Sequence, residues 1–200
     1  MIIVIEGISA AGKTTWCRAH GSGHHVPENG PPIGLPGPDA GTGAIAEYWA
    51  ERNVHRWRAA RAMEDRTGVA VCDTDPLKLH YTWGLWQIGA TDEADWLAAV
   101  TATRRTMVDQ RIGFADAYFV QPIDPARANA QAAGDPTRRR AKLSLHVQLQ
   151  PSLMAWYRAL DRALPGRVSF TWPDSLPQVP PRDRHPGVDA FDRLIAFLAD

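Results

Sequence analysis

The chain has 200 residues and is 44% hydrophobic, which suits one domain with a sizeable core. Its 22 Lys and Arg residues balance 22 Asp and Glu residues, so no net charge favours binding to nucleic acid or to a membrane surface. No apolar run approaches the roughly 20 residues of a transmembrane helix, and Cys17 and Cys72 predict neither a disulfide nor a metal site. We therefore expect a soluble, cytoplasmic protein that binds neither nucleic acid nor a membrane.

The first predicted strand, over 2–5, runs directly into a complete phosphate-binding P-loop, Gly-Ile-Ser-Ala-Ala-Gly-Lys-Thr at 7–14. Glycines at 7 and 12 allow a tight turn in which successive N–H groups face one anion, and the helix that follows adds its positive N-terminal end. Lys13 would reach the β- and γ-phosphates, and the Thr14 hydroxyl would complete the shell of a Mg²⁺ ion. A Gly-rich turn with a chance lysine is the alternative, but the order of strand, loop and helix favours the P-loop. The predicted residues for ATP and Mg²⁺ are Gly7, Ser9, Ala10, Ala11, Gly12, Lys13, Thr14 and Thr15.

A short second strand is predicted over 24–27, followed by Glu28 and a proline-rich loop over 30–43. Glu28 would lie at the carboxyl edge of the sheet, where ligands bind in open α/β folds. A carboxylate there could accept a hydroxyl proton as general base and contact the substrate, whereas the alternative is a solvated turn residue. One long helix is predicted over 44–67, with its arginines mostly on a solvated face.

An apolar stretch over 69–72 is predicted as the third strand, and it ends in Asp73-Thr74-Asp75-Pro76. A carboxylate at such a strand end can hold Mg²⁺ directly or through water, so Asp73 is the predicted catalytic and metal-side residue. Asp75 is the predicted substrate-side residue. The alternative is a turn in which Asp73 caps a helix.

Aromatic residues follow over 77–88, where Tyr81 and Trp83 could offer flat surfaces to a ring-bearing substrate. Packing in the core explains them equally well. A helix with a Thr91/Asp92 cap is predicted over 92–113, and a fourth strand over 115–121.

A basic segment over approximately 124–142 stands out in this neutral chain, and it includes Arg138, Arg139 and Arg140. Arginines on a closing lid can stabilise the charge of the transferring γ-phosphate and exclude water, so Arg138 and Arg139 are catalytic candidates. The alternative is a helix start with a solvated arginine stripe. A helix over 143–163, a fifth strand over 168–171, a proline-rich loop over 172–187 and a terminal helix over 188–198 complete the chain.

In these motifs the chain resembles the P-loop kinases, the nucleoside- and nucleotide-kinase-like phosphotransferases. The phosphate loop at 7–14, Asp73 after the third strand and the arginine-rich lid occur in the same order. Val-Ile-Glu-Gly at 4–7 and Pro27-Glu28 are similar to deoxynucleoside kinases, in which a glutamate at that place is the base for the 5′-hydroxyl. Asp-Thr-Asp at 73–75 is similar to the ribosylnicotinamide kinase type. The Glu-Arg pair of deoxynucleoside kinases and the Asp-Arg pair of thymidylate kinases are absent after the third strand. The resemblance therefore does not imply that this chain acts on the substrate of either group.

Together these features predict a single domain over 1–200 with a three-layer α/β/α P-loop fold and about five mostly parallel strands. The predicted activity is ATP-dependent transfer of the γ-phosphate to a hydroxyl of a nucleoside-like or antibiotic-like small molecule. A nucleoside monophosphate kinase is the first alternative, with Arg52, Arg56 and Arg58 as candidates for binding a second phosphate. A nucleotide-binding regulatory switch is the second, although no guanine-specific Asn-Lys-x-Asp stretch is present. A homodimer is compatible with the sequence.

Overall fold

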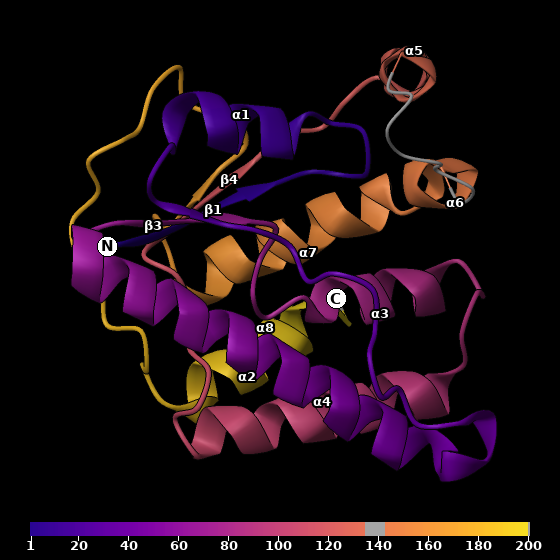
Figure 1. The fold of residues 1–200 in the computed structure, drawn as a ribbon. Helices are drawn as coiled ribbons and strands as arrows, with labels where there is room; N and C mark the ends of the chain where they lie inside the picture. Colours follow the sequence, from indigo (N-terminus) through magenta and orange to yellow (C-terminus); the bar gives the residue numbers. More distant parts are fainter. Residues whose placement is uncertain (135–142, 200) are drawn as a thin grey trace.

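A parallel β-sheet forms the centre of the molecule in the computed structural model, which describes residues 1–134 and 143–199 (Figure 1). Within these residues the strand order is β2-β3-β1-β4-β5, and every neighbouring pair is parallel. The strands are β1 (Ile2–Glu6), β2 (His25–Val26), β3 (Ala70–Asp73), β4 (Ala117–Val120) and β5 (Val168–Ser169). The helices are α1 (Lys13–His20), the 3₁₀ turn η1 (Pro38–Ala40), α2 (Gly41–Thr67), α3 (Leu79–Gln87), α4 (Glu93–Val108), α5 (Pro125–Ala133), α6 (Leu143–Gln148), α7 (Gln150–Ala163) and α8 (Val188–Phe197).

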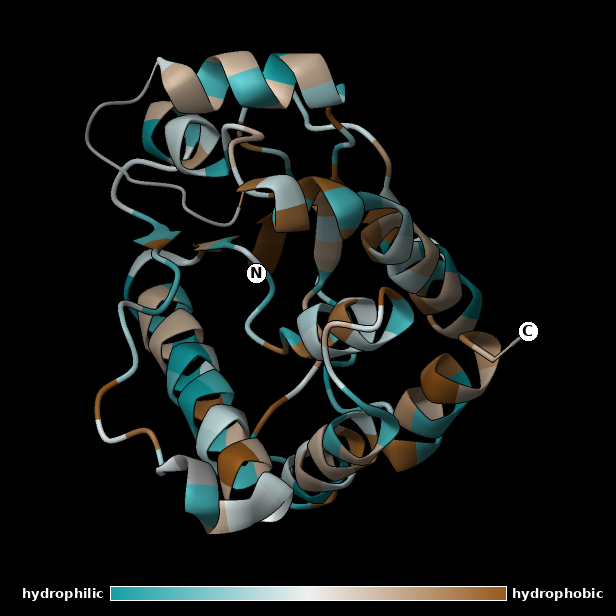
Figure 2. Ribbon diagram, turned by 90° about the vertical axis from the view of Figure 1, so that its right-hand side faces the viewer, coloured by the Kyte–Doolittle hydropathy of each residue, from teal (hydrophilic) through white to brown (hydrophobic). Residues whose placement is uncertain are grey.

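Two apolar layers cover the sheet, one on each face. Ile2 and Val4 of β1 face a large core shared with α2, α3, α4, α7 and α8, whereas Ile3 and Ile5 face a smaller core with α1 and Trp172. In Figure 2 the strand next to the N-terminus is brown, whereas the helices around it alternate between teal and brown. An unbroken run of β-branched residues suits a central parallel strand because both of its faces are buried. The predicted α/β/α fold is thus confirmed, with a sheet that is entirely parallel in the described residues.

The strand order brings the predicted functional segments to one edge. Ile5 pairs with Asp73 across β1 and β3, and Glu6 pairs with Val120 across β1 and β4. Parallel strands place their carboxyl ends together, so the P-loop after β1 and the acidic turn after β3 become neighbours. Because β1 pairs with both β3 and β4, it brings the P-loop and the acidic turn to the same edge of the sheet.

Several predicted boundaries differ from the structure. The helix predicted over 143–163 is divided into α6 and α7 around Leu149. Pro151 lies in the first turn of α7, where its missing N–H is tolerated, but inside one continuous helix it would break a hydrogen bond. The helix predicted to reach residue 113 ends at Val108, and the short second strand is limited to two residues. None of the helices in residues 1–134 and 143–199 combines the length and the apolar composition that crossing a membrane requires.

Arg184 connects the proline-rich loop over 172–187 to Glu64 of α2 and to Asp116, which precedes β4. Its guanidinium donates to Glu64 at 2.5 and 2.6 Å and to Asp116 at 2.6 and 3.2 Å. The Asp116 side chain is 0% exposed and also accepts the N–H of Ile2 at 2.7 Å. This buried carboxylate therefore depends on Arg184 for its charge partner.

We expect Arg184→Met to lower the free energy of unfolding by about 3 kcal/mol, because it leaves Asp116 buried without its cation. Chemical denaturation measures this change. Arg105→Met is the matched control, since Arg105 pairs with Glu47 on the surface with side chains 63% and 60% exposed and should cost less than about 1 kcal/mol. Equal losses in the two variants would contradict a structural role for the Arg184 network.

Candidate nucleotide-binding and phosphate-transfer site

The P-loop turns sharply between β1 and α1. A Cβ atom on Gly7 would lie 3.0 Å from the Cβ of Ala11 and 3.0 Å from the carbonyl oxygen of Gln121, so a larger residue would force these neighbours to shift. Gly12 has a φ of +98°, and Ala10 adopts a φ of 68° despite its side chain. Left-handed backbone at a non-glycine residue is unfavourable and is found mostly where function requires it. These conformations agree with a loop shaped to bind an anion.

Trp172, which follows β5, supports the P-loop. Its indole N–H donates to the carbonyl oxygen of Glu6 at 2.9 Å, and its ring lies 3.6 and 3.8 Å from where Cβ atoms on Gly7 and Gly12 would be. Trp16 adds a second tie, because its indole N–H donates to the carbonyl of Pro173 at 2.7 Å. Sequence reasoning assigned no contact to Trp172, although its position just after a strand, at the carboxyl edge of the sheet, is a signal that could have indicated this role.

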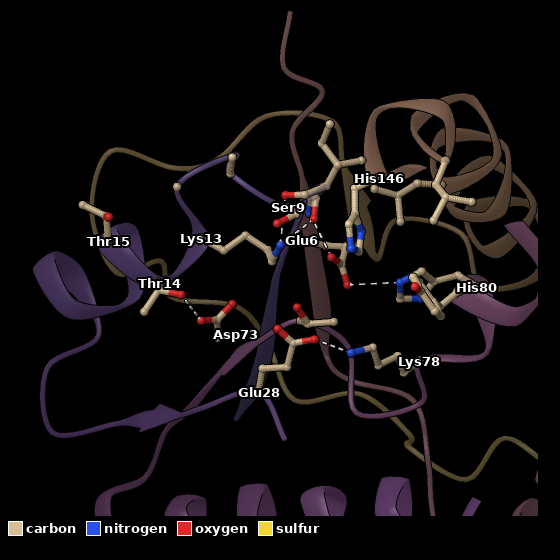
Figure 3. A pocket seen from close by; sticks show the side chains of 18 of the residues that line it. Glu6, Ser9, Lys13, Thr14, Thr15, Glu28, Asp73, Lys78, His80 and His146 are labelled. Carbon is tan, nitrogen blue, oxygen red and sulfur yellow. Dashed lines mark hydrogen bonds and ion pairs between the residues drawn. The ribbon is translucent and has the colours of Figure 1, made fainter. Parts of the chain in front are cut away.

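Lys13 points back over the loop (Figure 3). Its ammonium donates to the carbonyl oxygens of Gly7 at 2.6 Å and of Ile8 at 3.1 Å. These contacts hold the positive charge above the loop N–H groups, where phosphate oxygens would bind. Lys13 thus lies beside the main chain of the P-loop, and its contact with phosphates stays a prediction.

Thr14 and Asp73 form the candidate Mg²⁺ site. The Thr14 hydroxyl donates to Oδ2 of Asp73 at 2.5 Å, while the buried Oδ1 finds no hydrogen-bond partner among the described residues. Buried polar atoms normally have partners, so a free carboxylate oxygen beside a hydroxyl fits a hard cation. In residues 1–134 and 143–199, no group of three or more His, Cys, Asp or Glu side chains could hold a metal. The pair of Thr14 and Asp73 nevertheless suits Mg²⁺, because this ion is usually bound by one or two carboxylates together with phosphates and waters.

These groups open into one cavity of about 660 Å³. The P-loop lines this cavity together with Glu28, Lys78, Tyr81 and His146. Figure 3 shows Glu28 and Lys78 on the side of the cavity away from Ser9. Glu28 follows β2 and Lys78 precedes α3, so the cavity is built from segments that meet only in the folded chain. It is large enough for the phosphate chain of a nucleotide and one reacting group.

Glu28 is paired with Lys78, whose ammonium forms a short hydrogen bond to Oε1. Burial alone would raise the pKa of Glu28, but the Lys78 ammonium, together with the charges of Lys13 and Arg56, outweighs this effect and holds the pKa below its ordinary value. Glu28 is therefore ionised near neutral pH and able to accept a proton. Sequence reasoning missed Lys78, because a single lysine between a strand and a helix belongs to no motif.

Asp75 and Trp83, both predicted to contact substrate, are not among the described residues that line the cavity. Asp75 is 2% exposed and turns beneath the P-loop, where burial and the neighbouring Glu6 carboxylate raise its pKa to about 7. Trp83 is 5% exposed and packs against Trp156 of α7, with ring centroids 6.2 Å apart. Tyr81, two residues earlier in α3, does line the cavity. Arg138 and Arg139 lie outside the described residues.

A second cavity of about 550 Å³ adjoins the first, and Lys78 and Tyr81 line both. Its walls come from α2, α3, α4 and the loop after Glu28, with aromatic and aliphatic side chains such as Trp49, Ile45 and Leu85. The polar groups Asn53, Thr82, Thr91, Thr103 and Asp95 are distributed among them. An apolar pocket with a few polar groups is typical of a site for a small organic molecule.

No protein-family model matches the chain. No curated protein matches it either. Solved structures with a similar fold include three of deoxyadenosine kinase from M. mycoides. The one with the products dCMP and dCDP has a TM-score of 0.58 and 12% identity, covering 100% of this chain and 97% of that chain. Those with bound dATP and dCTP have TM-scores of 0.51 and 0.53, each at 13% identity over 85% of this chain and over 91% and 90% of theirs. At these identities the likeness establishes the architecture: the chain has the P-loop kinase fold that deoxyadenosine kinase adopts.

Proposed function

We propose that this protein is an ATP-dependent kinase that transfers the γ-phosphate to a hydroxyl of a small, nucleoside-like molecule. The observation that carries the proposal is the shared cavity, in which Lys13, the Thr14–Asp73 pair and an ionised Glu28 face one another. The solved structures of similar fold support it, since they are of a deoxyadenosine kinase with nucleotides bound. Phosphoryl transfer requires mainly positioning and charge stabilisation, and this cavity offers both.

Each residue has a role that follows from its position. The loop N–H groups and Lys13 would bind the phosphates, while Thr14 and Asp73 would hold Mg²⁺, which neutralises phosphate charge when bound. Glu28 would accept the proton of the acceptor hydroxyl as that oxygen attacks the γ-phosphorus. Lys78 keeps Glu28 ionised and oriented through their hydrogen bond. We also propose that Arg138 and Arg139 cover the γ-phosphate during transfer.

We propose the second cavity as the acceptor site. It adjoins the first cavity at Lys78, which lines both and is paired with Glu28. Its volume of about 550 Å³ suits a nucleoside or another ring compound of that size. Tyr81, which lines both cavities, would contact the acceptor near the reacting hydroxyl. Antibiotics with a free hydroxyl remain in the proposed substrate class on the same grounds of size and lining.

A nucleoside monophosphate kinase is less consistent with this geometry. The Arg56 guanidinium donates to three main-chain carbonyls of residues 73–75, and the Arg52 guanidinium donates to the carbonyl of Gly30 and to Tyr48. Arg58 is exposed on α2. Among the described residues that line the second cavity, Lys78 is the one with a cationic side chain, and it is paired with Glu28. A second phosphate would therefore find no uncommitted cation in the described walls.

The proposed function is tested by incubating the protein with Mg·ATP and panels of nucleosides, nucleoside monophosphates and hydroxylated antibiotics. Products are identified by the mass gain of one phosphoryl group. We expect an unphosphorylated ring compound to be modified, and faster than any monophosphate. Preferential conversion of monophosphates to diphosphates would contradict the proposed acceptor class.

We expect Lys78→Met to shift the acidic limb of kcat/KM to higher pH. The wild-type pKa of Glu28 is lowered by the Lys78 ammonium, so the base stays ionised until the pH falls below its ordinary value of 4.5. Without the ammonium, the main charge that lowers this pKa is lost, so the pKa should rise and activity should be lost at a higher pH as the solution is acidified. The pH dependence of kcat/KM measures the shift, and Lys78→Arg, which keeps the charge, is the control. An unchanged limb in Lys78→Met would show that Lys78 does not control the base.

A further inference from the structure

The turn that follows Asp73 is conformationally strained. Thr74, a β-branched residue, adopts a φ of 76°, a left-handed conformation that such residues strongly disfavour. Thr74 is 4% exposed, and its N–H donates to the carbonyl of Ile5 at 3.0 Å. Strained backbone of this kind persists only where the surrounding structure enforces it. The contacts around the turn identify what enforces it here.

Arg56 holds the turn from the side of α2. Its guanidinium, on a residue that is 4% exposed, donates to the carbonyls of Asp73 at 2.9 Å, Thr74 at 2.7 Å and Asp75 at 3.0 Å. Three consecutive carbonyls converging on one cation define the path of the main chain through the turn. A lysine could not reproduce this pattern, because it lacks the planar fork of donors.

Glu6 holds the turn from the side of β1. Its Oε2 accepts the N–H of Asp75 at 3.0 Å, and its Oε1 accepts the N–H of Gly7 at 2.9 Å. The Tyr157 hydroxyl lies 3.4 Å both from Oε2 of Glu6 and from Oδ2 of Asp75. A single carboxylate, 1% exposed, thereby joins the first residue of the P-loop to the last aspartate of the turn. Although Glu6 borders the floor of the cavity, both of its oxygens already accept main-chain N–H groups.

We propose that Glu6 and Arg56 are positioning residues that clamp the 73–75 turn against the P-loop and so fix the Asp73 carboxylate beside the Thr14 hydroxyl. The clamp sets the geometry of the two groups that would hold Mg²⁺ and touches neither nucleotide phosphate nor acceptor itself. The clamp also explains why Asp75 is buried and does not line the cavity. Its N–H donates to Glu6, and its carboxylate accepts the N–H of Leu77 at 3.0 Å. This inference rests on the proposed function, because it assigns a role toward the same metal.

The alternative is that these contacts only stabilise the fold. Thr74→Gly separates the two roles, because glycine relieves the strain at positive φ but also allows the main chain many other conformations, so the turn no longer follows a single path. If Glu6 and Arg56 serve stability alone, relaxing residue 74 should leave metal binding unchanged. If the turn positions Asp73, a more flexible turn should weaken metal binding without lowering the unfolding temperature.

The test compares the unaltered protein with Arg56→Lys and Thr74→Gly, with Arg58→Lys as matched control on the exposed face of the same helix. Calorimetry gives the affinity for ADP in Mg²⁺ and in EDTA, and thermal unfolding monitors the fold. We expect ADP affinity in EDTA to be similar in all four proteins. The gain in affinity on adding Mg²⁺ should fall about tenfold or more in Arg56→Lys and Thr74→Gly, as is typical when partners of metal ligands are removed. Arg58→Lys should keep the full gain.

The possible outcomes are distinct. If the unaltered protein shows no gain with Mg²⁺, the proposed metal-dependent function and the clamp are both overturned. If it shows the gain and Arg56→Lys and Thr74→Gly keep it, the clamp alone is overturned. If Arg56→Lys loses ADP affinity in EDTA and melts at a lower temperature, while Thr74→Gly keeps the full gain, Arg56 serves the fold and the clamp is likewise overturned.

Discussion

Replacing Lys13 with alanine is expected to reduce phosphate transfer by at least on the order of 10²- to 10³-fold. The ammonium is held over the P-loop by the carbonyls of Gly7 and Ile8, at 2.6 and 3.1 Å, which is where charge on the β- and γ-phosphates would be neutralised. Steady-state rates with the acceptor found in the screen measure the loss.

The fold should survive this substitution, because Lys13 is only partly buried and its side chain lines the cavity and does not belong to the apolar core. We expect the free energy of unfolding to change by no more than about 1 kcal/mol. His20→Ala at the exposed C-terminal end of α1, which is not among the described residues lining the cavity, is the control for the helix and should retain most of the activity. Unchanged turnover in Lys13→Ala would refute the assignment of the P-loop.

Replacing Glu28 with glutamine is expected to lower kcat by about 10²- to 10⁴-fold while changing the KM for the acceptor little. Glutamine keeps the size of the side chain and can still accept a hydrogen bond from Lys78, but it cannot accept the hydroxyl proton. Kinetic measurements at saturating ATP separate the two parameters.

Glu93→Gln is the matched control for Glu28→Gln, because Glu93 is an exposed residue in the first turn of α4. It should leave kcat and KM close to the wild-type values. A loss in Glu28→Gln confined to KM would assign Glu28 to acceptor binding and move the base to another residue.

The parts of the site that could be predicted are those carried by contiguous sequence. The P-loop joins a buried strand, a glycine-containing turn and a helix within 2–20, so local chemistry determines its shape. The positions of Glu28 and Asp73 were also predictable, because Glu28 follows a predicted short strand, Asp73 ends an apolar one, and strand ends meet at the binding edge of a parallel sheet.

The parts that could not be predicted depend on contacts between distant segments. Lys78 becomes a partner of Glu28 across 50 positions, and Glu6 meets the N–H of Asp75 across 69. The pattern Asp-Thr-Asp did not reveal that Thr74 takes a positive φ, which turns Asp75 inward toward Tyr157. Trp83 offered no way to distinguish core from pocket, since aromatic residues serve both.

The destination of the γ-phosphate shows whether the cavity transfers phosphate to an organic hydroxyl. ATP labelled in its γ-phosphate is incubated with the protein, Mg²⁺ and the acceptor panel, and the label is followed into products. We expect the label to become covalently bound to a previously unphosphorylated acceptor, and Lys13→Ala to abolish this transfer. Label found solely as inorganic phosphate, with every acceptor unmodified, would contradict this expectation and favour a nucleotide-hydrolysing switch.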